Sequence, residues 1–534
     1  MALLERTPKF TLQAALNARA SSDPEAPYLL SRDRVFSYAE VEDQADSLAA
    51  ALHGLGIGKG DRVALVMPPW PEFVVSLFAV AKLGAVAVPL NPRLTPPELQ
   101  YMLRHSEAAA AVTVETFQGT DYLQLFEDMF PMLPELQYLV TVGEEDLWYD
   151  DRVFQFEDLI SAGVGREYPS PEANPQRDVV ALLYTSGTTG KPKGVELTHT
   201  NLLHAAGGTV RALGLMPEDR VFGITALFHV FGLGPGLLGT LLSGSSLVLQ
   251  EDFEPGPALD LIQRHGVTVH YGVPTLFTRE LLEQQDTPRD ISTLRLGLVA
   301  GAPVNDSFLH RMEEHFCPEM RVGYSLTETS STLAMTTGGD SSEKRYQTVG
   351  KALDGMEIRV LQTDQTQLPL ESLGEIAVRG PAVMRGYYRQ PGETRNAFTE
   401  DGFFLTGDLG MVDEAGYLHL VSRSKEVIIR SGVNVFPREV EDRILAHPAV
   451  REVAVVGLPD EVLGEAVAAA VVPIEGAIVT GGEIQEWCRV TLTEHKVPDL
   501  VRFLDRLPLT GSGKVRKVEL IRLLVPQPSG NSSP

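Results

Sequence analysis

Short apolar runs alternate with longer helical patterns along the first two thirds of the chain. The run Asp61–Met67 predicts a strand, the spacing of apolar residues from Pro71 to Leu83 predicts a helix, and Ala85–Leu90 predicts a second strand. A strand, helix and strand in this order are typical of parallel sheets with helical crossovers. Three further strands are expected after helical stretches, at Ser246–Gln250, Val267–Tyr271 and Leu294–Ala300.

The pattern changes after about residue 355. Strict alternation of apolar and polar residues, bounded by Asp and Gly turns, predicts a small antiparallel sheet. Its strands are expected at Glu357–Leu361, Gly374–Gly380 and Gly416–Ser422. After Arg423 the chain reads as a compact α+β unit, with strands at 425–430, 451–457, 466–473 and 500–505 and helices at 437–447 and 481–494.

We therefore expect an α/β protein with two domains. The large N-terminal domain, residues 1–422, contains parallel-type sheets with helices and the small antiparallel β subdomain. A small, mobile α+β C-terminal domain follows at 423–526, and the Ser-, Pro- and Gly-rich tail at 527–534 is expected to be disordered. A length of 534 residues agrees with more than one core.

Composition excludes some functions. The formal net charge of -26 argues against a nucleic-acid partner, because phosphate backbones are held by surplus Lys and Arg. Two distant cysteines, Cys317 and Cys488, form no disulfide framework and no zinc motif, and each reads as a small buried hydrophobe. With no signal peptide apparent at the N-terminus, a cytoplasmic location is expected.

The segment from Val221 to Gln250 contains no Asp, Glu, Lys or Arg and is long enough to span a bilayer. Its six glycines, its serines, His229 and Pro235 argue against a transmembrane helix. We interpret it as a buried strand–loop–helix passage that lines a pocket. Contact with a membrane surface stays open.

The segment from Thr185 to Gly194 has the composition of a phosphate-binding loop and follows an apolar strand, Val179–Tyr184. Its glycines allow several N–H groups to converge on one anion, and its hydroxyls and lysines add donors and charge. The P-loop spacing GxxxxGK[ST] is not met, since Pro192 stands where magnesium would need Ser or Thr. The residues predicted to bind phosphate are Thr185, Ser186, Gly187, Thr188, Thr189, Gly190 and Lys193.

This loop resembles the signature of the adenylate-forming superfamily, which includes acyl-CoA synthetases, adenylation domains of peptide synthetases and firefly-type luciferases. Further segments similar to that family recur from about residue 30 to residue 520, in the family's order. Arg321–Thr329 resembles its YGxTE segment, with Ser325 where Gly is usual. The resemblance implies that ATP contacts Gly323, Tyr324, Ser325 and Thr327, and that Glu328 and Thr185 hold Mg²⁺.

Other matches imply further roles. Asp408 and Arg423 resemble the residues that bind ribose, and Gly301, Ala302 and Pro303 resemble the segment that flanks adenine and the acyl end. Lys425 corresponds to the hinge of the C-terminal domain and Lys514 to the lysine that assists adenylation. Gly432 lies where pantetheine of CoA would pass, although Ile429-Arg430-Ser431 departs from relatives that carry a lysine before this glycine.

The resemblance implies an ATP-dependent acyl-CoA synthetase of fatty acid metabolism. The acid would become acyl-AMP with release of pyrophosphate, and the CoA thiol would then displace AMP. His229 would act as a gate or packing group of the acyl pocket. The lack of a buried acid from Val221 to Gln250 favours an uncharged tail, with medium- or long-chain fatty acids first and aryl or alicyclic acids second.

Three alternatives stay open: a ligase that transfers its acyl-adenylate to a carrier protein or an amine, a luciferase-type oxygenase, and an inactive nucleotide sensor. The oxygenase is less favoured than the ligase that transfers its acyl-adenylate to a carrier protein or an amine. The presence of Lys514, Glu328 and Asp408 together argues against the sensor. The oligomeric state is not readable from the sequence, and a homodimer stays open.

Overall fold

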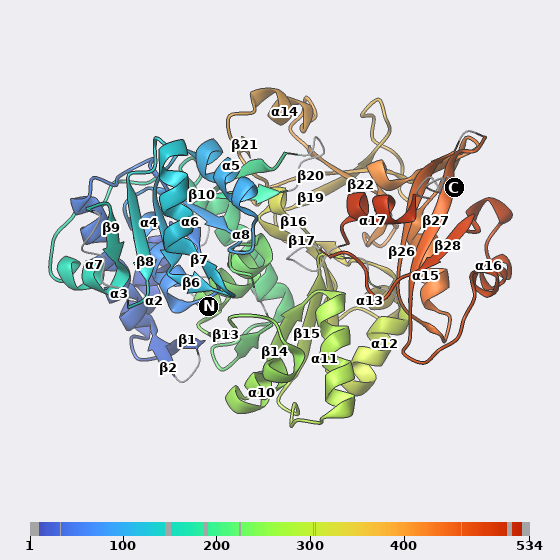
Figure 1. The fold of residues 1–534 in the computed structure, drawn as a ribbon, viewed down its shortest axis with the longest axis horizontal. Helices are drawn as coiled ribbons and strands as arrows, with labels where there is room; N and C mark the ends of the chain where they lie inside the picture. The colour runs from blue at the N-terminus through green and yellow to red at the C-terminus, as the bar shows by residue number, and fades with distance from the viewer. Residues whose placement is uncertain are drawn as a thin grey trace, which may run out of the picture.

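The computed structural model describes residues 10–31, 34–144, 151–185, 191–223, 226–302, 304, 306–460, 462–509 and 515–525. Within these residues two large, mainly parallel sheets form the N-terminal domain, drawn in blue to yellow in Figure 1. The mixed α/β architecture, with antiparallel sheets and a separate C-terminal domain, confirms the predicted fold class.

The first large sheet carries several predicted site residues at its carboxyl end, namely Gly301, Ala302, Gly323, Tyr324 and Ser325. Its central strands are parallel, and antiparallel strands close both edges. In the described residues its order is β18 (Lys351–Ala352), β17 (Ser331–Met335), β16 (Met320–Leu326), β15 (Leu296–Ala300), β14 (Val269–Gly272), β12 (Arg220–Phe222), β13 (Ser246–Leu249), β1 (Pro27–Ser31) and β2 (Arg34–Ser37).

The second large sheet contains the strand that leads into the predicted phosphate loop. Its order is β21 (Gly386–Tyr387), β11 (Lys193–Thr198), β10 (Val179–Thr185), β4 (Val86–Leu90), β3 (Arg62–Val66), β5 (Ala108–Val114), β8 (Tyr138–Val142) and β9 (Val153–Gln155). The strands β3 and β4 lie within a residue of their predicted bounds. A hairpin of β6 (Thr116–Phe117) and β7 (Thr120–Asp121) stands beside this sheet.

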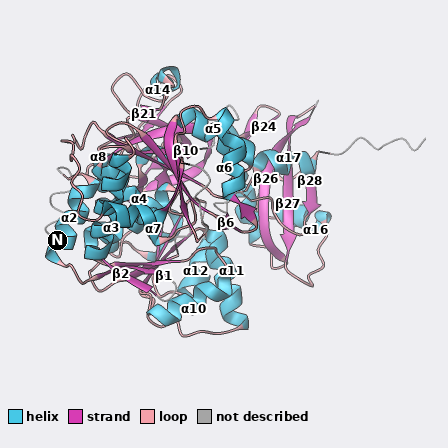
Figure 2. Cartoon of the chain, turned by 60° about the vertical axis from the view of Figure 1, so that its left-hand side comes forward, coloured by secondary structure: helices cyan, strands magenta, loops and turns pink. Residues whose placement is uncertain are grey.

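Helices fill the space between the two sheets and cover their outer faces (Figures 1 and 2). The helix α8 (His199–Leu213) contacts both β17 and β11 and therefore lies between the sheets. The others in this domain are α2 (Leu12–Ser22), α3 (Tyr38–Gly54), α4 (Pro71–Lys82), α5 (Pro96–Ser106), α6 (Tyr122–Met129), η2 (Phe130–Met132), α7 (Phe156–Gly163), α10 (Pro255–His265), α11 (Pro274–Asp286), α12 (Asp306–His315), η4 (Thr327–Thr329), α13 (Ser342–Gln347) and α14 (Pro391–Asn396).

Most of the described residues in the uncharged stretch from Val221 to Gln250 are buried, as predicted. Between β12 and β13 it forms a π-helix, η3 (Gly232–Leu238), followed by α9 (Gly239–Ser243). Pro235 lies inside the π-helix, which explains why an ordinary α-helix does not run through this segment. Among the described residues no helix is both long enough and apolar enough to cross a membrane.

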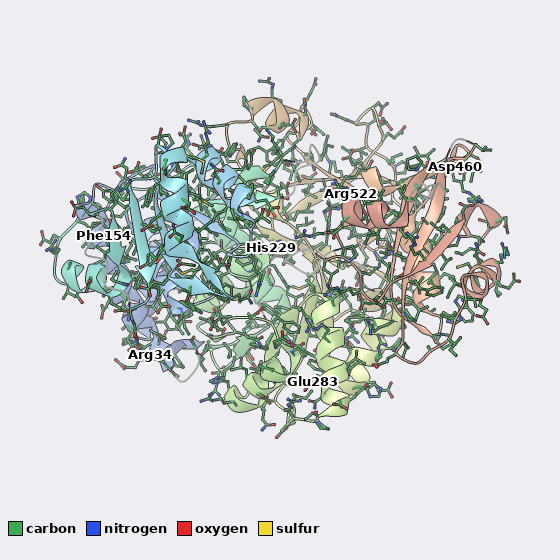
Figure 3. All side chains as sticks on the ribbon, viewed as in Figure 1. Arg34, Phe154, His229, Glu283, Asp460 and Arg522 are labelled. Carbon is green, nitrogen blue, oxygen red and sulfur yellow. The ribbon has the colours of Figure 1, made fainter. Side chains whose placement is uncertain are left out.

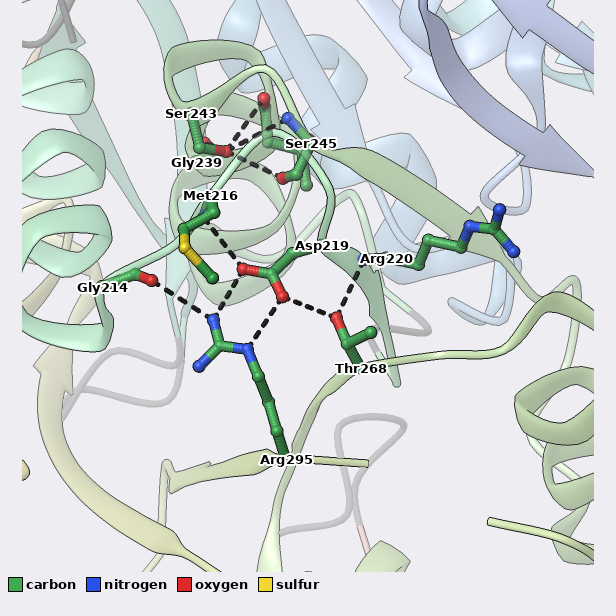
Figure 4. Close-up of polar contacts among 10 residues, drawn as sticks. Gly214, Met216, Asp219, Arg220, Gly239, Ser243, Ser245, Thr268 and Arg295 are labelled. Atoms are coloured by element: carbon green, nitrogen blue, oxygen red, sulfur yellow. Dashed lines mark hydrogen bonds and ion pairs between the residues drawn. The ribbon is translucent and has the colours of Figure 1, made fainter. Parts of the chain in front are cut away.

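A buried carboxylate ties the amino ends of three parallel strands together (Figure 4). Asp219, just before β12, accepts two hydrogen bonds from the Arg295 guanidinium at 2.9 and 2.6 Å. The Thr268 hydroxyl donates to Asp219 at 2.7 Å. Because Thr268 precedes β14 and Arg295 precedes β15, this network fixes the strands at the end opposite to the predicted site.

The small antiparallel sheet is present, with order β19 (Glu357–Leu361), β20 (Gly374–Arg379), β22 (Phe404–Val412) and β23 (Leu418–Arg423). The C-terminal domain has its own sheet and a hydrophobic cluster on each face of it. Both Cys317 and Cys488 are buried free thiols, as predicted. The C-terminal elements are η5 (Ser424–Glu426), β24 (Ile428–Arg430), β25 (Val433–Val435), α15 (Pro437–Leu445), β26 (Val450–Asp460), β27 (Gly464–Pro473), α16 (Gly481–Arg489), η6 (Glu494–Lys496), β28 (Leu500–Phe503) and α17 (Lys517–Leu524).

Three predicted boundaries in the C-terminal domain are wrong by three residues or more, and one of them is the end of the strand expected at 451–457, which runs to Asp460. The helix expected at 481–494 ends at Arg489, because the chain turns there and Leu492 packs against the domain's core. The strand expected from residue 425 begins at Ile428, since Ser424–Glu426 form a short 3₁₀ turn between the two domains.

Candidate nucleotide and acyl site

A bulged turn in β22 positions Asp408. The Thr406 hydroxyl donates to the carbonyl of Ile376 at 2.7 Å and accepts the Asp408 N–H at 3.1 Å. Gly407 has φ of 72°, a conformation that favours glycine, and its N–H donates to Glu375 at 3.2 Å. The pairing register of β22 shifts against β20 across this turn and against β23 just after it, as expected for a bulge that redirects a side chain.

The Asp408 carboxylate is shared by two groups that the sequence predicted for the same site. The Tyr324 hydroxyl donates to one oxygen, and Arg423 Nε lies 3.1 Å from the other. Burial and the neighbouring Asp408 charge raise the pKa of Tyr324 far above its usual value, so the phenol stays a donor. Burial alone would lower the pKa of Arg423, but nearby anions including Asp408 and Glu328 outweigh it and raise that pKa.

A second cluster connects the phosphate-loop strand to the predicted magnesium ligand. The Tyr387 hydroxyl donates to Glu328 Oε1 at 2.9 Å. Burial and the Glu328 charge raise the pKa of Tyr387 well above its usual value, which keeps this hydroxyl protonated. Lys193 Nζ lies 4.8 Å above the Tyr387 ring and forms an ion pair with Glu393. The structure thus brings Lys193 to the ring and Glu328 to the hydroxyl of the same tyrosine.

The carboxyl ends of β15 and β16 supply the small residues expected near adenine. Ala300 pairs with Gly323 in parallel register, and Gly301, which follows, has φ of 82°. Along β16 and η4, Ser325, Thr327 and Glu328 are half-buried, whereas Gly323 and Tyr324 are buried. Ala302 is half-buried beside Gly301. These residues therefore converge at one edge of the sheet.

His229 lies near the middle of the molecule (Figure 3) and is half-buried just before η3. Its Nδ1 accepts the N–H of Phe231 at 3.3 Å, which fixes the ring at the start of the helical segment. The Phe231 ring in turn stacks on Tyr271 of β14, with ring centroids 6.0 Å apart. This arrangement agrees with the predicted gate or packing role beside an acyl pocket, which stays a prediction.

One predicted site residue of the C-terminal domain, Gly432, is exposed to solvent and does not join this cluster. Gly432 stands in the exposed turn between β24 and β25, with φ of 80°, and residues 431–434 are exposed. Arg430 forms an ion pair with Asp499 inside its own domain. Among the described residues, Arg438 of α15 contacts the N-terminal domain, since it donates to the carbonyls of Val304 at 2.7 Å and Leu420 at 3.2 Å.

Some predicted residues lie outside the described part of the chain: Ser186, Gly187, Thr188, Thr189, Gly190, Pro303 and Lys514. Thr185, at the end of β10, is half-buried and described. Near Lys514, Arg516 approaches the N-terminal domain. Hydrogen bonds from Thr95 lower the pKa of Glu98 in α5, and the charge of Arg516 contributes to the same shift.

Sequence reasoning missed Tyr387, Glu393 and Arg438. Tyr387 is separated from Glu328 by 59 residues, so no local spacing connects them. The partners of Arg438 are main-chain carbonyls, which have no residue type to recognise. Among the described residues, no three His, Cys, Asp or Glu side chains gather to form a metal site of their own.

Comparison with known proteins gives the class. Residues 16–388 match the family described as AMP-binding enzyme, and 439–514 match its C-terminal domain. The chain is 34% identical over 522 residues to the putative acyl-CoA synthetase YngI of Bacillus subtilis (strain 168), which covers 94% of each chain. It is 35% identical over 504 residues to a feruloyl-CoA synthase of Amycolatopsis sp, covering 94% of this chain and 97% of the relative.

Solved structures agree. The anthranilate CoA ligase AuaEII in complex with anthranoyl-AMP has a TM-score of 0.88 at 27% identity and covers 96% of this chain and 97% of its own. ATP-bound MatB from Rhodopseudomonas palustris has a TM-score of 0.85 at 30% identity, with 96% and 99% covered. The chain belongs to the family of AMP-binding enzymes. Within this adenylate-forming superfamily it falls in the acyl-CoA synthetase branch.

Proposed function

We propose that this protein is an ATP-dependent, AMP-forming acyl-CoA synthetase that activates a carboxylic acid with an uncharged tail. The observation that carries the proposal is the Asp408 carboxylate, held between Tyr324 and Arg423 next to Glu328. The relatives include a putative acyl-CoA synthetase and a feruloyl-CoA synthase, and these names support CoA as the acceptor of the acyl group.

The proposed nucleotide contacts combine the family resemblance with the geometry of this cluster. Asp408 presents acceptor oxygens to both ribose hydroxyls, while Arg423 and Tyr324 keep the carboxylate ionised and oriented. Tyr324 also offers a ring face to adenine, beside Gly301 and Ala302. Thr185, Thr327 and Lys193 surround the phosphates, with the loop that follows Thr185. Lys193 becomes available to phosphate when its pairing with Glu393 loosens.

Glu328 fits a magnesium ion that is shared with ATP. It offers a single carboxylate, one oxygen of which accepts the Tyr387 hydroxyl, and Mg²⁺ in nucleotide enzymes commonly uses one or two carboxylates plus phosphate oxygens and water. When bound, the ion would neutralise phosphate charge as pyrophosphate leaves.

Adenylation requires positioning and charge stabilisation more than covalent help. The acid enters ionised, so no general base is needed at its carboxylate. Thr327 and Lys514 would stabilise the charge that develops on the α-phosphate, and His229 would separate the acyl end from water. In the structure Arg438 holds the C-terminal domain against the N-terminal domain and Arg516 lies near Glu98, an arrangement that suits this first half-reaction.

The second half-reaction requires a different arrangement of the same domain. Gly432 and its neighbours face solvent, whereas a thiol tunnel would need them against the acyl-adenylate. We therefore propose domain boundaries near residue 422, with the C-terminal domain rotating about Lys425 once acyl-AMP has formed. Rotation breaks the Arg438 contacts and withdraws Lys514. Arg430 stays paired with Asp499, so it is not expected to replace the lysine of some relatives.

Two classes of acid suit the residues of the predicted acyl pocket. Medium- and long-chain fatty acids suit the buried, uncharged segment from Val221 to Gln250 and the ligases of such acids among the relatives. An aryl acid is favoured by the stacked pair of Phe231 and Tyr271 and by the feruloyl-CoA synthase relative.

The test is an acid panel assayed for pyrophosphate release with and without CoA. We expect acid-dependent release, and acyl-CoA formation when CoA is added. Release of pyrophosphate with no consumption of CoA would indicate a carrier-protein or amine ligase. No release with any acid would leave the nucleotide sensor as the better description.

A further inference from the structure

Residues 381–387 connect β20 of the small antiparallel sheet to β21 at the edge of the second large sheet. Residues 381–385 belong to neither a helix nor a strand, so their backbone groups have no partners in a regular ladder. The segment ends at Tyr387, whose hydroxyl donates to Glu328 Oε1 at 2.9 Å. The orientation of Glu328 therefore depends on what holds this irregular segment in place.

A single side chain holds the segment at two points. Asn201, in the first turn of α8, is 8% exposed, and its Nδ2 donates to the carbonyls of Pro381 at 2.7 Å and Val383 at 2.8 Å. Its Oδ1 accepts the N–H of Thr198 at 2.9 Å. These partners also fix which way the amide is turned, because a carbonyl only accepts and an N–H only donates.

Two further hydrogen bonds tie the same segment to the turn that carries Glu328. The Ser330 hydroxyl donates to the carbonyl of Ala382 at 2.8 Å, and the N–H of Met384 donates to the carbonyl of Glu328, also at 2.8 Å. Together with the two bonds from Asn201, they pair one backbone group in each of residues 381–384. A segment without regular structure is in this way fixed between α8 and η4.

The role of Asn201 at the start of its own helix does not account for these contacts. In the capping box of α8, Asn201 accepts the N–H of Thr198, and the Thr198 hydroxyl accepts the N–H of Asn201 at 3.2 Å. This exchange requires only an acceptor at position 201, which is why Glu is common at that place in a capping box. The two donors of the amide serve residues 381–387 and not the helix.

The two ends of this network belong to different sheets. The helix α8 follows β11 directly, and β11 pairs both with β10, which leads into the predicted phosphate loop, and with β21, where Val195 lies opposite Tyr387. Glu328 follows β16 of the other large sheet. Asn201 therefore lies where it can set the position of the predicted magnesium ligand relative to the phosphate-loop strand.

We propose that Asn201 is a positioning residue for adenylation: it holds residues 381–387 so that the Tyr387 hydroxyl orients Glu328 toward the magnesium ion of ATP. The inference rests on the proposed ligase function and assigns to it a residue that touches neither substrate nor metal. Partners that orient a metal ligand are worth about 10–100-fold. Loss of the two donors should weaken metal binding by about tenfold, the lower end of that range, because the bonds from Ser330 and Met384 remain.

Two matched variants separate the segment from the helix cap. Asn201→Asp keeps an acceptor for the N–H of Thr198 but places a carboxylate oxygen, in place of two donors, against two carbonyls. Thr198→Ala removes the hydroxyl of the capping box and leaves both bonds to the segment in place. With pyrophosphate release as the assay, the Mg²⁺ concentration for half-maximal rate should rise about tenfold in Asn201→Asp and stay unchanged in Thr198→Ala.

A double variant tests whether Asn201 acts through Tyr387. If both residues act on Glu328 by one path, the shifts in the Mg²⁺ midpoint caused by Asn201→Asp and Tyr387→Phe should combine to less than their product. Shifts that multiply fully would overturn the inference. Ser330→Ala provides a milder variant of the same segment, since it removes only the bond to Ala382, and should shift the midpoint in the same direction by less.

Metal binding without turnover gives a readout independent of activity. The probe is Mn²⁺, whose free concentration is measured by electron paramagnetic resonance while the protein is titrated with α,β-methylene-ATP and no acid. The Kd of Mn²⁺ should rise about tenfold in Asn201→Asp and stay unchanged in Thr198→Ala, although both variants should lower Tm. A lower Tm with an unchanged Kd in Asn201→Asp would show a purely structural residue and overturn the inference. If the unaltered protein released no pyrophosphate with any acid, the ligase proposal would fail, and the Mn²⁺ titration would still decide the role of Asn201.

Discussion

The two sides of the site differ in what they offer a ligand. On the nucleotide side, Asp408, Tyr324 and Arg423 bind one another, and the Tyr387 hydroxyl binds Glu328. On the predicted acyl side, the segment from Val221 to Gln250 carries no charged residue, and its Phe231 ring stacks on Tyr271. Polar groups that hold one another are preorganised for a ligand that never changes, here ATP. Apolar walls discriminate between ligands only loosely, which suits the acid that differs between relatives.

The largest expected effect is a loss of adenylation with every acid, caused by a change in the nucleotide-binding residues. Asp408→Asn leaves Arg423 without its carboxylate partner and weakens the ribose contacts, so adenylation should fall by about 10²–10⁴, the size of two lost charge-assisted hydrogen bonds. Acid-dependent pyrophosphate release at saturating ATP, together with the KM for ATP, measures it.

A carboxylate at the other end of the sheet provides the control. Asp219 is equally well paired, with Arg295 and Thr268, but lies at the amino ends of the strands. Asp219→Asn should lower Tm and leave the KM for ATP unchanged. If both variants changed the KM for ATP to the same degree, Asp408 would affect ATP binding through the stability of the fold and not through contacts with ribose.

The next largest effect concerns the metal. Glu328→Gln removes the negative charge from the predicted magnesium ligand, and kcat for adenylation should fall by about 10²–10³. The Mg²⁺ concentration that gives half-maximal activity should rise. A titration of Mg²⁺ at fixed ATP measures both, and an unchanged midpoint would exclude Glu328 as the ligand.

Tyr387→Phe should have a smaller effect of the same kind. The variant keeps the ring under Lys193 but removes the hydroxyl that orients Glu328. Partners that orient a metal ligand are worth about 10–100-fold, so a shift of the Mg²⁺ midpoint within that range is expected. A fall in kcat with no shift in the midpoint would place Tyr387 in another role.

The pattern of apolar residues predicted most of the fold. The strands β3 and β4 and the helix α4 lie close to their expected bounds, because the spacing of their buried apolar residues is enough to tell a strand from a helix. The resemblance to the adenylate-forming superfamily predicted Asp408 and Arg423 for one site, and their neighbouring strands bring them together. The Tyr387–Glu328 and Phe231–Tyr271 contacts could not be predicted, since they join segments that only tertiary packing makes adjacent.

A moderate effect should separate the two half-reactions. Arg438→Ala removes the hydrogen bonds to Val304 and Leu420, so acyl-adenylate formation should fall about tenfold. Conversion of supplied acyl-adenylate to thioester should be unchanged, because that step requires the contact to be broken. The control is Arg451→Ala, whose hydrogen bond to Asp505 stays inside the C-terminal domain. Equal loss of both half-reactions would exclude a role in domain orientation.

The smallest expected effect concerns Ser331, which lies against Gly234 of the predicted acyl segment. Ser331→Gly removes a side chain from a backbone that favours glycine, and no hydrogen bond among the described residues is lost. The free energy of unfolding should rise by about 0.5–1 kcal/mol. Chemical denaturation measures the change, and a destabilised variant would show that the Ser331 side chain serves the fold.

The central claim is that the paired groups around Asp408 form a site that adenylates a carboxylate. Isotope exchange between pyrophosphate and ATP tests it most directly, because this exchange requires reversible formation of acyl-AMP and nothing from the second step. We predict exchange that depends on the acid, needs no CoA and is lost in Asp408→Asn but kept in Asp219→Asn. Exchange that is absent with every acid, or that survives in Asp408→Asn, would contradict the account.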